Sequence, residues 1–208
     1  MRTTPAAPPR KPNKRGVAAR EKLLSTALEM LGTGRPETVS INMVAKEAGL
    51  SWGSVQNLFG DSDGFWSSVI ELIIEAGPEL WAAPESATVQ GRVAEVAELY
   101  RSVLASPYGV AIETVRAGLP RPLDVLAESH PRTSASLARL DELWAEAFLH
   151  FFATLDGPPV DADRASDVAA LLPSALRGLR ADQQFGTTVD IDRAHRTLVT
   201  ALTTYLEG

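Results

Sequence analysis

The sequence contains no cysteine, and this absence removes several kinds of site at once. Disulfide bonds, thiolate metal sites and cysteine nucleophiles are all excluded, which fits a reducing cytosol. No apolar run approaches the roughly 18 residues needed to cross a membrane, because charges such as Glu71 and Glu75 interrupt each hydrophobic stretch. The opening residues also lack the apolar stretch of a secretory signal. We therefore expect a cytoplasmic protein without a membrane partner.

The usual signatures of catalysis and of metal binding are absent as well. No nucleophile with a neighbouring base, pair of carboxylates or glycine-rich phosphate loop stands at a recognisable spacing. The three histidines, His130, His150 and His195, are isolated, and none has a metal-ligating partner at helical spacing. We predict no catalytic residue, no metal site and no cofactor. A helical enzyme is therefore the less favoured interpretation.

Positive charge is concentrated at the start of the chain. The formal net charge of the whole sequence is −6, which alone disfavours a nucleic-acid partner. Residues 1–25, however, contain seven basic side chains and one acidic side chain. A basic head on an acidic remainder is expected when one end of a protein meets phosphate. Within this head, the basic and proline-rich segment 1–14 is predicted to be a disordered tail.

Helical periodicity predicts an all-α chain with two domains, 15–77 and 78–208. In the first domain, apolar side chains recur at helical spacing in four stretches, which are bounded by glycines and by Ser or Asp caps. In the second domain, we predict helices over 88–105, 107–117, 121–129, 132–155, 163–184 and 190–206. Pro173 is expected to kink the fifth of these or to mark a local irregularity in it.

Two short helices in the first domain are joined by a tight turn. Ser40 is a suitable N-cap for the first helix, Gly49 ends it, and Ser51 caps the second. This pattern predicts a helix-turn-helix, in which the first helix and the turn brace the second at a steep angle. The polar face of the second helix can then enter a DNA major groove about 12 Å wide.

The polar side chains of this second helix suit base reading. Gln56 and Asn57 carry amides that can pair bidentately with adenine, and serines can reach a base or a phosphate. Helix N-termini offer free N–H groups to phosphate, and basic residues before the first helix suit a groove or backbone contact. Two interpretations of Trp52 stay open, because it can touch DNA or pack beneath the arm. The predicted DNA-binding residues are Lys14, Arg15, Ser40, Asn42, Ser51, Trp52, Gly53, Ser54, Gln56, Asn57, Asp61 and Ser62.

The run from Thr38 to Asp61 resembles the DNA-binding signature of the TetR family of transcriptional regulators. The family's Ala-Gly-aliphatic-Ser turn matches residues 48–51, and its following glycine and its closing phenylalanine match Gly53 and Phe59. The resemblance covers about residues 17–77. It implies a three-helix DNA-binding domain followed by a larger helical bundle that binds a ligand and forms a homodimer.

Two positions depart from the family pattern. The family usually has a tyrosine where Gln56 stands and a lysine where Ser62 stands, and both commonly bind phosphate. The Trp-Gly-x-Val-Gln opening is similar to a subset of the family in which glutamine is usual at this position. We therefore expect DNA binding with altered backbone contacts, for which the basic tail can compensate.

The larger domain is expected to supply both dimerisation and sensing. The last two helices present apolar side chains that we predict to pair with their copies about a two-fold axis. These are Val168, Leu171, Leu172, Leu176, Leu179, Ile191, Leu198, Leu202 and Leu206. Aromatic and polar residues gather in the middle of the domain, where they predict a cavity for an apolar or aromatic compound. The alternative is a solid core. The predicted ligand-binding residues are Tyr100, Tyr108, Glu113, Arg116, Trp144, Phe148, His150 and Phe151.

Taken together, the sequence predicts a regulator of transcription that binds double-stranded DNA as a homodimer. The favoured form is a repressor that a small apolar effector releases from a palindromic operator. An architectural DNA-binding protein without an effector is the alternative, and it differs in having no cavity in its second domain.

Overall fold

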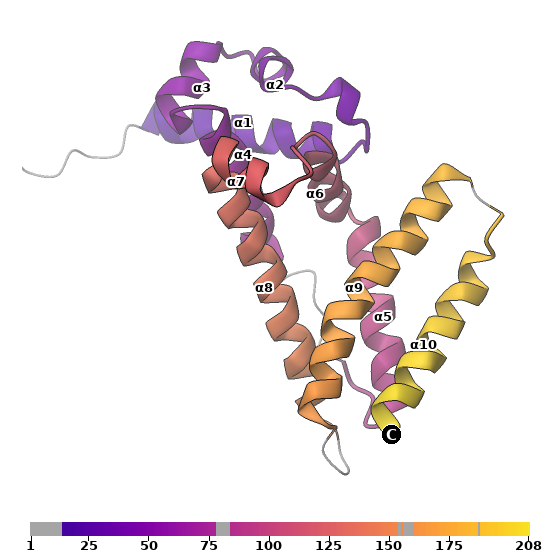
Figure 1. Ribbon diagram of the computed structural model, residues 1–208. Coiled ribbons are helices and arrows are strands. Elements are labelled where there is room, and N and C mark those ends of the chain that lie inside the picture. The colour runs from indigo at the N-terminus through magenta and orange to yellow at the C-terminus, as the bar shows by residue number, and fades with distance from the viewer. Residues whose placement is uncertain (1–13, 78–83, 154, 156–159, 187) are drawn as a thin grey trace, which may run out of the picture.

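The computed structural model describes residues 14–77, 84–153, 155, 160–186 and 188–208. These residues form ten α-helices and one short 3-10 helix, with no strand among them, so the predicted all-α fold is confirmed (Figure 1). Apart from Lys14, the predicted tail 1–14 lies outside the described residues. Of the helices in the described ranges, none has the length and apolar character that a membrane span requires.

The N-terminal helices gather at one end of the molecule. They are α1 (Lys14–Leu31), η1 (Pro36–Thr38), α2 (Ile41–Glu47), α3 (Trp52–Phe59) and α4 (Ser62–Ala76). Figure 1 shows α1, α2 and α3 grouped at the top, while α4 runs downward into the rest of the chain. Their shared core contains fully buried apolar side chains such as Leu23, Val44, Val55 and Phe65.

The remaining helices form an elongated bundle. They are α5 (Val89–Ala105), α6 (Pro107–Ala117), α7 (Leu123–Ser129), α8 (Pro131–Ala153), α9 (Ala162–Phe185) and α10 (Ile191–Glu207). Each lies within a few residues of the range predicted from periodicity and caps. Helix α9 stays a single helix through Pro173.

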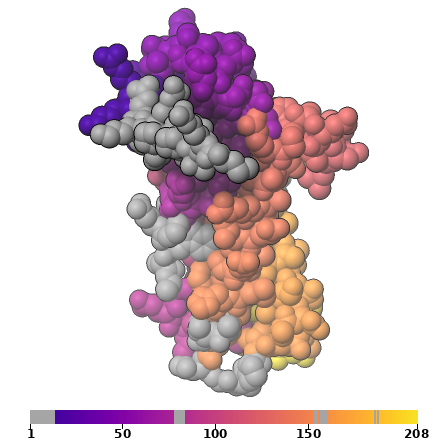
Figure 2. Space-filling view, turned by 90° about the vertical axis from the view of Figure 1, so that its left-hand side faces the viewer, coloured from indigo at the N-terminus to yellow at the C-terminus, as the bar shows by residue number. Residues whose placement is uncertain are grey.

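The molecule has two hydrophobic cores. The division between them does not coincide with the domain boundary that the sequence predicts at residue 78. The first core joins α1–α4 to parts of α6, α7 and α8 through Ile112, Leu126 and Leu137. The second core joins α5, the end of α8, α9 and α10 around Phe148 and Leu172. Helix α6 therefore packs in the first core, whereas helix α8 contributes to both cores. Figure 2 shows the region around α7 in salmon, projecting from the side below the α1–α3 end, and Leu123 there is 78% exposed.

Candidate nucleic-acid interface and ligand cavity

Helix α2, which leads into the turn before α3, is fixed by hydrogen bonds at both of its ends. The Ser40 hydroxyl caps α2 by accepting from the Met43 N–H at 3.3 Å. At the other end of α2, the Leu50 N–H donates to the Ala45 carbonyl at 2.8 Å, and Gly49 between them has a φ of +67°. Only glycine adopts this conformation without strain. The sequence therefore sets the sharp turn that brings α3 across α2.

Helix α3 is anchored through one apolar face. The Ser51 hydroxyl accepts from the Ser54 N–H at 3.3 Å, which starts the helix. Val55 and Phe59 then point into the core, where the Phe59 ring meets the Phe65 ring edge-on at 5.1 Å between centroids. Such aromatic pairs stabilise packing by about 1 kcal/mol beyond the area they bury.

The opposite face of α3 is open to solvent. Trp52, Gly53, Gln56 and Asn57 are exposed, and Ser54 is half-buried beside Ser51. Trp52 is 39% exposed, which leaves its indole accessible to a partner. A polar, solvent-facing N-terminal half on a braced helix is the arrangement that major-groove reading requires.

The other predicted DNA contacts lie at the starts of α1, α2 and α4. Lys14 and Arg15 are exposed at the start of α1, and Ser40 and Asn42 are exposed at the start of α2 (Figure 1). Two further predicted residues, Asp61 and Ser62, stand at the start of α4.

The Asp61 carboxylate is engaged within the fold. It accepts from the Gly64 N–H at 2.8 Å and forms an ion pair with Arg132 of α8. The N-terminus of α4 is thus already capped by a negative charge, which disfavours a phosphate at that point. Asp61 is the N-cap of α4 and Ser62 its first residue, and their contact with DNA stays a prediction.

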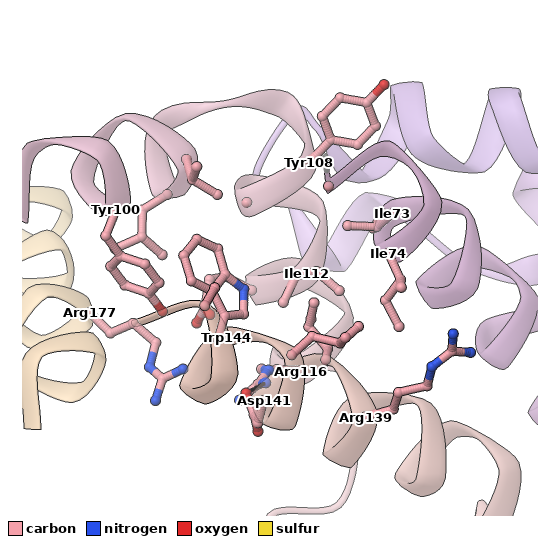
Figure 3. Close-up of a pocket in the computed structure, with 18 of the residues that line it drawn as sticks. Ile73, Ile74, Tyr100, Tyr108, Ile112, Arg116, Arg139, Asp141, Trp144 and Arg177 are labelled. Atoms are coloured by element: carbon pink, nitrogen blue, oxygen red, sulfur yellow. Dashed lines mark hydrogen bonds and ion pairs between the residues drawn. The ribbon is translucent and has the colours of Figure 1, made fainter. Parts of the chain in front are cut away.

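A cavity of about 580 Å³ lies between α4, α5, α6, α8 and α9 (Figure 3). Its walls are mostly apolar, with Ile73, Ile74, Leu104, Ile112 and Leu140 among the lining residues. Five of the eight residues predicted for ligand binding line it, namely Tyr100, Tyr108, Glu113, Arg116 and Trp144. Tyr100 and Trp144 meet edge-on at 4.6 Å between ring centroids, whereas the Tyr108 hydroxyl points away from the other labelled residues.

Polar groups stand at the α6–α8 side of this cavity. Arg116 forms an ion pair with Asp141 at 2.7 Å, and its Nε is buried without a hydrogen-bond partner among the described residues. Burial raises the pKa of the Tyr100 hydroxyl, while the nearby Arg177 opposes that shift. The cavity therefore combines a neutral phenol with a buried donor that has no hydrogen-bond partner in the described part of the chain.

The other three predicted ligand residues lie elsewhere. Phe148 and Phe151 are buried in the second core, and His150 is exposed. A helix has more than one apolar stripe when it packs on two sides, so the aromatic series in α8 includes core residues as well as cavity residues. The sequence analysis missed Ile73, Leu140 and Arg177, which come from three separate helices and share no local signal. In the described ranges, no group of three or more His, Asp or Glu side chains is placed to hold a metal.

Five of the nine residues predicted to pair between two copies need correction. Val168, Leu172, Leu176, Leu202 and Leu206 are buried within the chain itself, where α9 and α10 pack on α5 and α8. Periodicity identified the apolar face of each helix but not its partner. Leu171, which was also predicted to pair, is exposed. The exposed face of these two helices further carries Ala170, Ser174, Gly178, Thr197, Ala201 and Tyr205.

The arrangement as a whole is an all-α fold with an N-terminal helix-turn-helix and a larger helical domain. No family model matches the sequence, and no curated protein matches it significantly. Solved structures do match. A tetR-family transcriptional regulator from Streptomyces coelicolor aligns over 91% of this chain and 80% of that chain, with a TM-score of 0.65 and 16% identity.

Two further structures give the same result. GusR of Salmonella enterica aligns over 96% of this chain and 100% of that chain, with a TM-score of 0.60 and 17% identity. The multidrug binding protein EbrR, complexed with imidazole, aligns over 89% of each chain, with a TM-score of 0.54 and 19% identity. The chain therefore has the TetR-type fold, as the resemblance of residues 17–77 predicted.

Proposed function

We propose that this protein is a transcriptional regulator that binds a DNA operator through α3. The observation that carries the proposal is the exposed polar face of α3, with Gln56 and Asn57 held outward by the Gly49 turn and by the buried Val55. Gln and Asn amides can each make two hydrogen bonds to adenine in the major groove. Lys14 and Arg15 add sequence-independent contacts to phosphate.

The cavity supports a sensing role for the same protein. An architectural DNA-binding protein has no use for about 580 Å³ of mostly apolar space, so this volume favours a small-molecule effector over that alternative. The unused Nε of Arg116 favours an apolar or aromatic compound that carries a hydrogen-bond acceptor. Binding of this compound releases the protein from the operator and so relieves repression. The protein is thus proposed to be a repressor that acts in the cytoplasm.

A homodimer fits the remaining exposed surface. Small side chains at Ala170, Ser174 and Gly178 follow one face of α9 at four-residue spacing, and Leu171 beside them is 54% exposed. Small residues let two helices approach closely. Two copies paired through α9 and α10 present two α3 helices, which must stand roughly 34–36 Å apart to enter successive major grooves.

Selection from a random pool of DNA duplexes tests the DNA-binding proposal. The expected result is a palindromic consensus whose half-site centres are about one helical turn apart. Recovery of no consensus sequence would refute an operator-specific regulator. A consensus without symmetry would leave DNA binding intact and refute the dimer.

A library of small aromatic and aliphatic compounds tests the sensor. A true effector raises the melting temperature of the protein and lowers its operator affinity. It also changes the fluorescence of Trp144, a change that Trp144→Phe removes. If no compound in a diverse library alters melting temperature or operator affinity, the protein is a DNA binder without an effector.

A further inference from the structure

Arg132, in the first turn of α8, contacts three points at the junction of α3 and α4. Its side chain reaches the carbonyl of Phe59, the last residue of α3, at 3.5 Å. It also forms ion pairs with Asp61 and with Asp63, the latter at 3.2 Å from Nε to Oδ2. One side chain of the bundle thus holds both the end of the recognition helix and the start of the helix that follows it.

Asp63 joins the N-terminal ends of α4 and α8. Its carboxylate accepts from the backbone N–H of Arg132 at 3.0 Å and of Thr133 at 2.9 Å, which are among the free donors of the first turn of α8. The Thr133 hydroxyl donates in return to the Asp63 carbonyl at 3.1 Å. Asp63 and Thr133 are both buried, so the hydrogen bonds between them are shielded from solvent.

A glycine makes room for the guanidinium. A Cβ added at Gly64 would lie 2.2 Å from the Phe59 carbonyl oxygen and 2.6 Å from Nη1 of Arg132. Both distances are far below van der Waals contact, so any larger residue at position 64 would displace Arg132 or the end of α3. The sequence therefore provides the space that the three-way contact needs.

Two more polar contacts continue along α4 and α8. Ser67 and Ser136 share a hydrogen bond at 2.9 Å, and Arg139 donates to Glu71 at 2.7 Å. We call the contacts of Asp63, Ser67 and Glu71 with α8 the polar seam. Their spacing of four residues on α4 and three or four on α8 shows that the two helices run parallel, as Figure 1 also shows.

The cavity begins where the polar seam ends. Ile73 and Ile74 of α4 and Leu140 and Trp144 of α8 line it, one to five residues beyond the Glu71–Arg139 contact, and Arg139 itself is also in the lining. The same two helices are therefore joined at the α3 end and separated by the cavity at the other. Because helices are stiff, a change in their separation at the cavity must be taken up as rotation at the joined end.

We propose that Arg132 couples the cavity to the recognition helix. By holding Phe59, Asp61 and Asp63 together, it makes the end of α3 and the start of α4 move with α8, so that filling the cavity reorients α3. This inference rests on the proposed function, since it concerns how an effector would change operator affinity. Arg132 touches neither DNA nor the cavity and acts by positioning.

The test replaces the unidentified effector with a side chain. Ala147→Trp places an indole in the cavity from α8, and operator affinity is then measured by fluorescence anisotropy on the full chain. The operator is the consensus selected from random duplexes. The measurement is made in the parent background, in Arg132→Met and in Arg101→Met. If Ala147→Trp does not fold, as judged by circular dichroism, Ala147→Leu takes its place.

Arg101→Met is the matched control. The Arg101 side chain is 48% exposed against 49% for Arg132, and it likewise contacts two acids, Glu98 and Asp192. Arg132→Met leaves Asp63 with the two backbone donors of α8, so the junction stays capped and the variant is expected to fold.

We expect Ala147→Trp to change the operator Kd by about tenfold in the parent and in Arg101→Met, and by less than about twofold in Arg132→Met. Amide hydrogen exchange over residues 52–59, without DNA, should follow the same pattern. An equal change in all three backgrounds, or no change in any, overturns the role of Arg132. If no DNA is selected, the exchange measurement still decides the coupling while the proposed function fails.

Discussion

Asp63 shows how one buried carboxylate can hold two helices together. Burial by itself would raise the pKa of Asp63, but hydrogen bonds from the backbone and side chains of Thr133 and Arg132 outweigh it and lower the pKa below 3.8. The ionised form is therefore favoured in the folded protein. Its contribution to stability is fully present above the pKa of the unfolded chain and is lost as pH falls through the lower pKa of the folded state.

We predict that Asp63→Asn lowers the free energy of unfolding at neutral pH by about 1–3 kcal/mol, because the amide weakens charge-assisted hydrogen bonds in a buried place. The difference from the parent should begin to shrink as pH falls below about 4, the ordinary pKa of an aspartate in the unfolded chain, and should go on shrinking towards the lower pKa of the folded state. Urea unfolding at several pH values measures it. Asp163→Asn, an exposed acid at the start of α9, is the control. A difference that is independent of pH would contradict the assignment.

Gln56 and Asn57 are the side chains from which base discrimination is expected. Replacing either with Ala should reduce the preference for the operator over random DNA by about 1–3 kcal/mol if its contact is bidentate. Affinity for random DNA should barely change, because phosphate contacts supply it. Competition binding measures both quantities, and Gln90→Ala on α5 is the control. Unchanged discrimination in both variants would mean that α3 docks in another orientation.

At the scale of elements, the start of α1 is expected to contact the DNA backbone. Replacing Lys14 and Arg15 together with Gln should weaken binding to all sequences. The slope of log affinity against log salt should become shallower by roughly 0.9 for each phosphate contact removed. The pair Lys14→Arg and Arg15→Lys keeps the charge and should keep the slope. An unchanged slope in the Gln variant would show that these residues do not meet phosphate.

Local signals were sufficient to predict the helices of the N-terminal domain. Ser40, Ser51 and Asp61 each cap the helix that follows, and Gly49 adopts the left-handed conformation on which the turn depends. These effects act within four residues, so the sequence reports them directly. The same holds for the helix bounds of the larger domain, where Ser106 caps α6.

Contacts between distant helices could not be predicted in this way. Arg132 and Asp63 contact each other although they are 69 positions apart in the sequence. Neither residue belongs to a sequence motif that would predict the other as its partner. The cavity could not be predicted for the same reason, because it lies between five helices whose packing depends on contacts between distant residues. For α9 and α10, periodicity gave the buried face correctly, but Leu172 and Leu202 pack inside the chain rather than against a second copy.

For the whole molecule, pairing of two copies is predicted to decide operator affinity. Ala201 is exposed on α10, so Ala201→Arg should leave the fold of a single chain intact while placing a charge between the two copies. We expect a monomer by light scattering at micromolar concentration, with operator affinity reduced by about a hundredfold or more, because the second half-site no longer binds in concert. Ala117→Arg on α6 is the control. A dimeric Ala201→Arg variant would place the interface elsewhere.

The parallel pair α4 and α8, joined at the polar seam and parted by the cavity, has a consequence in the cell. If filling the cavity disfavours the operator, then by thermodynamic reciprocity the operator disfavours filling the cavity by the same factor. Each DNA site then competes with the effector for the protein. A cell that carries many copies of the operator should need more effector for half-maximal induction than a cell that carries one, although the protein, the compound and the cavity are unchanged.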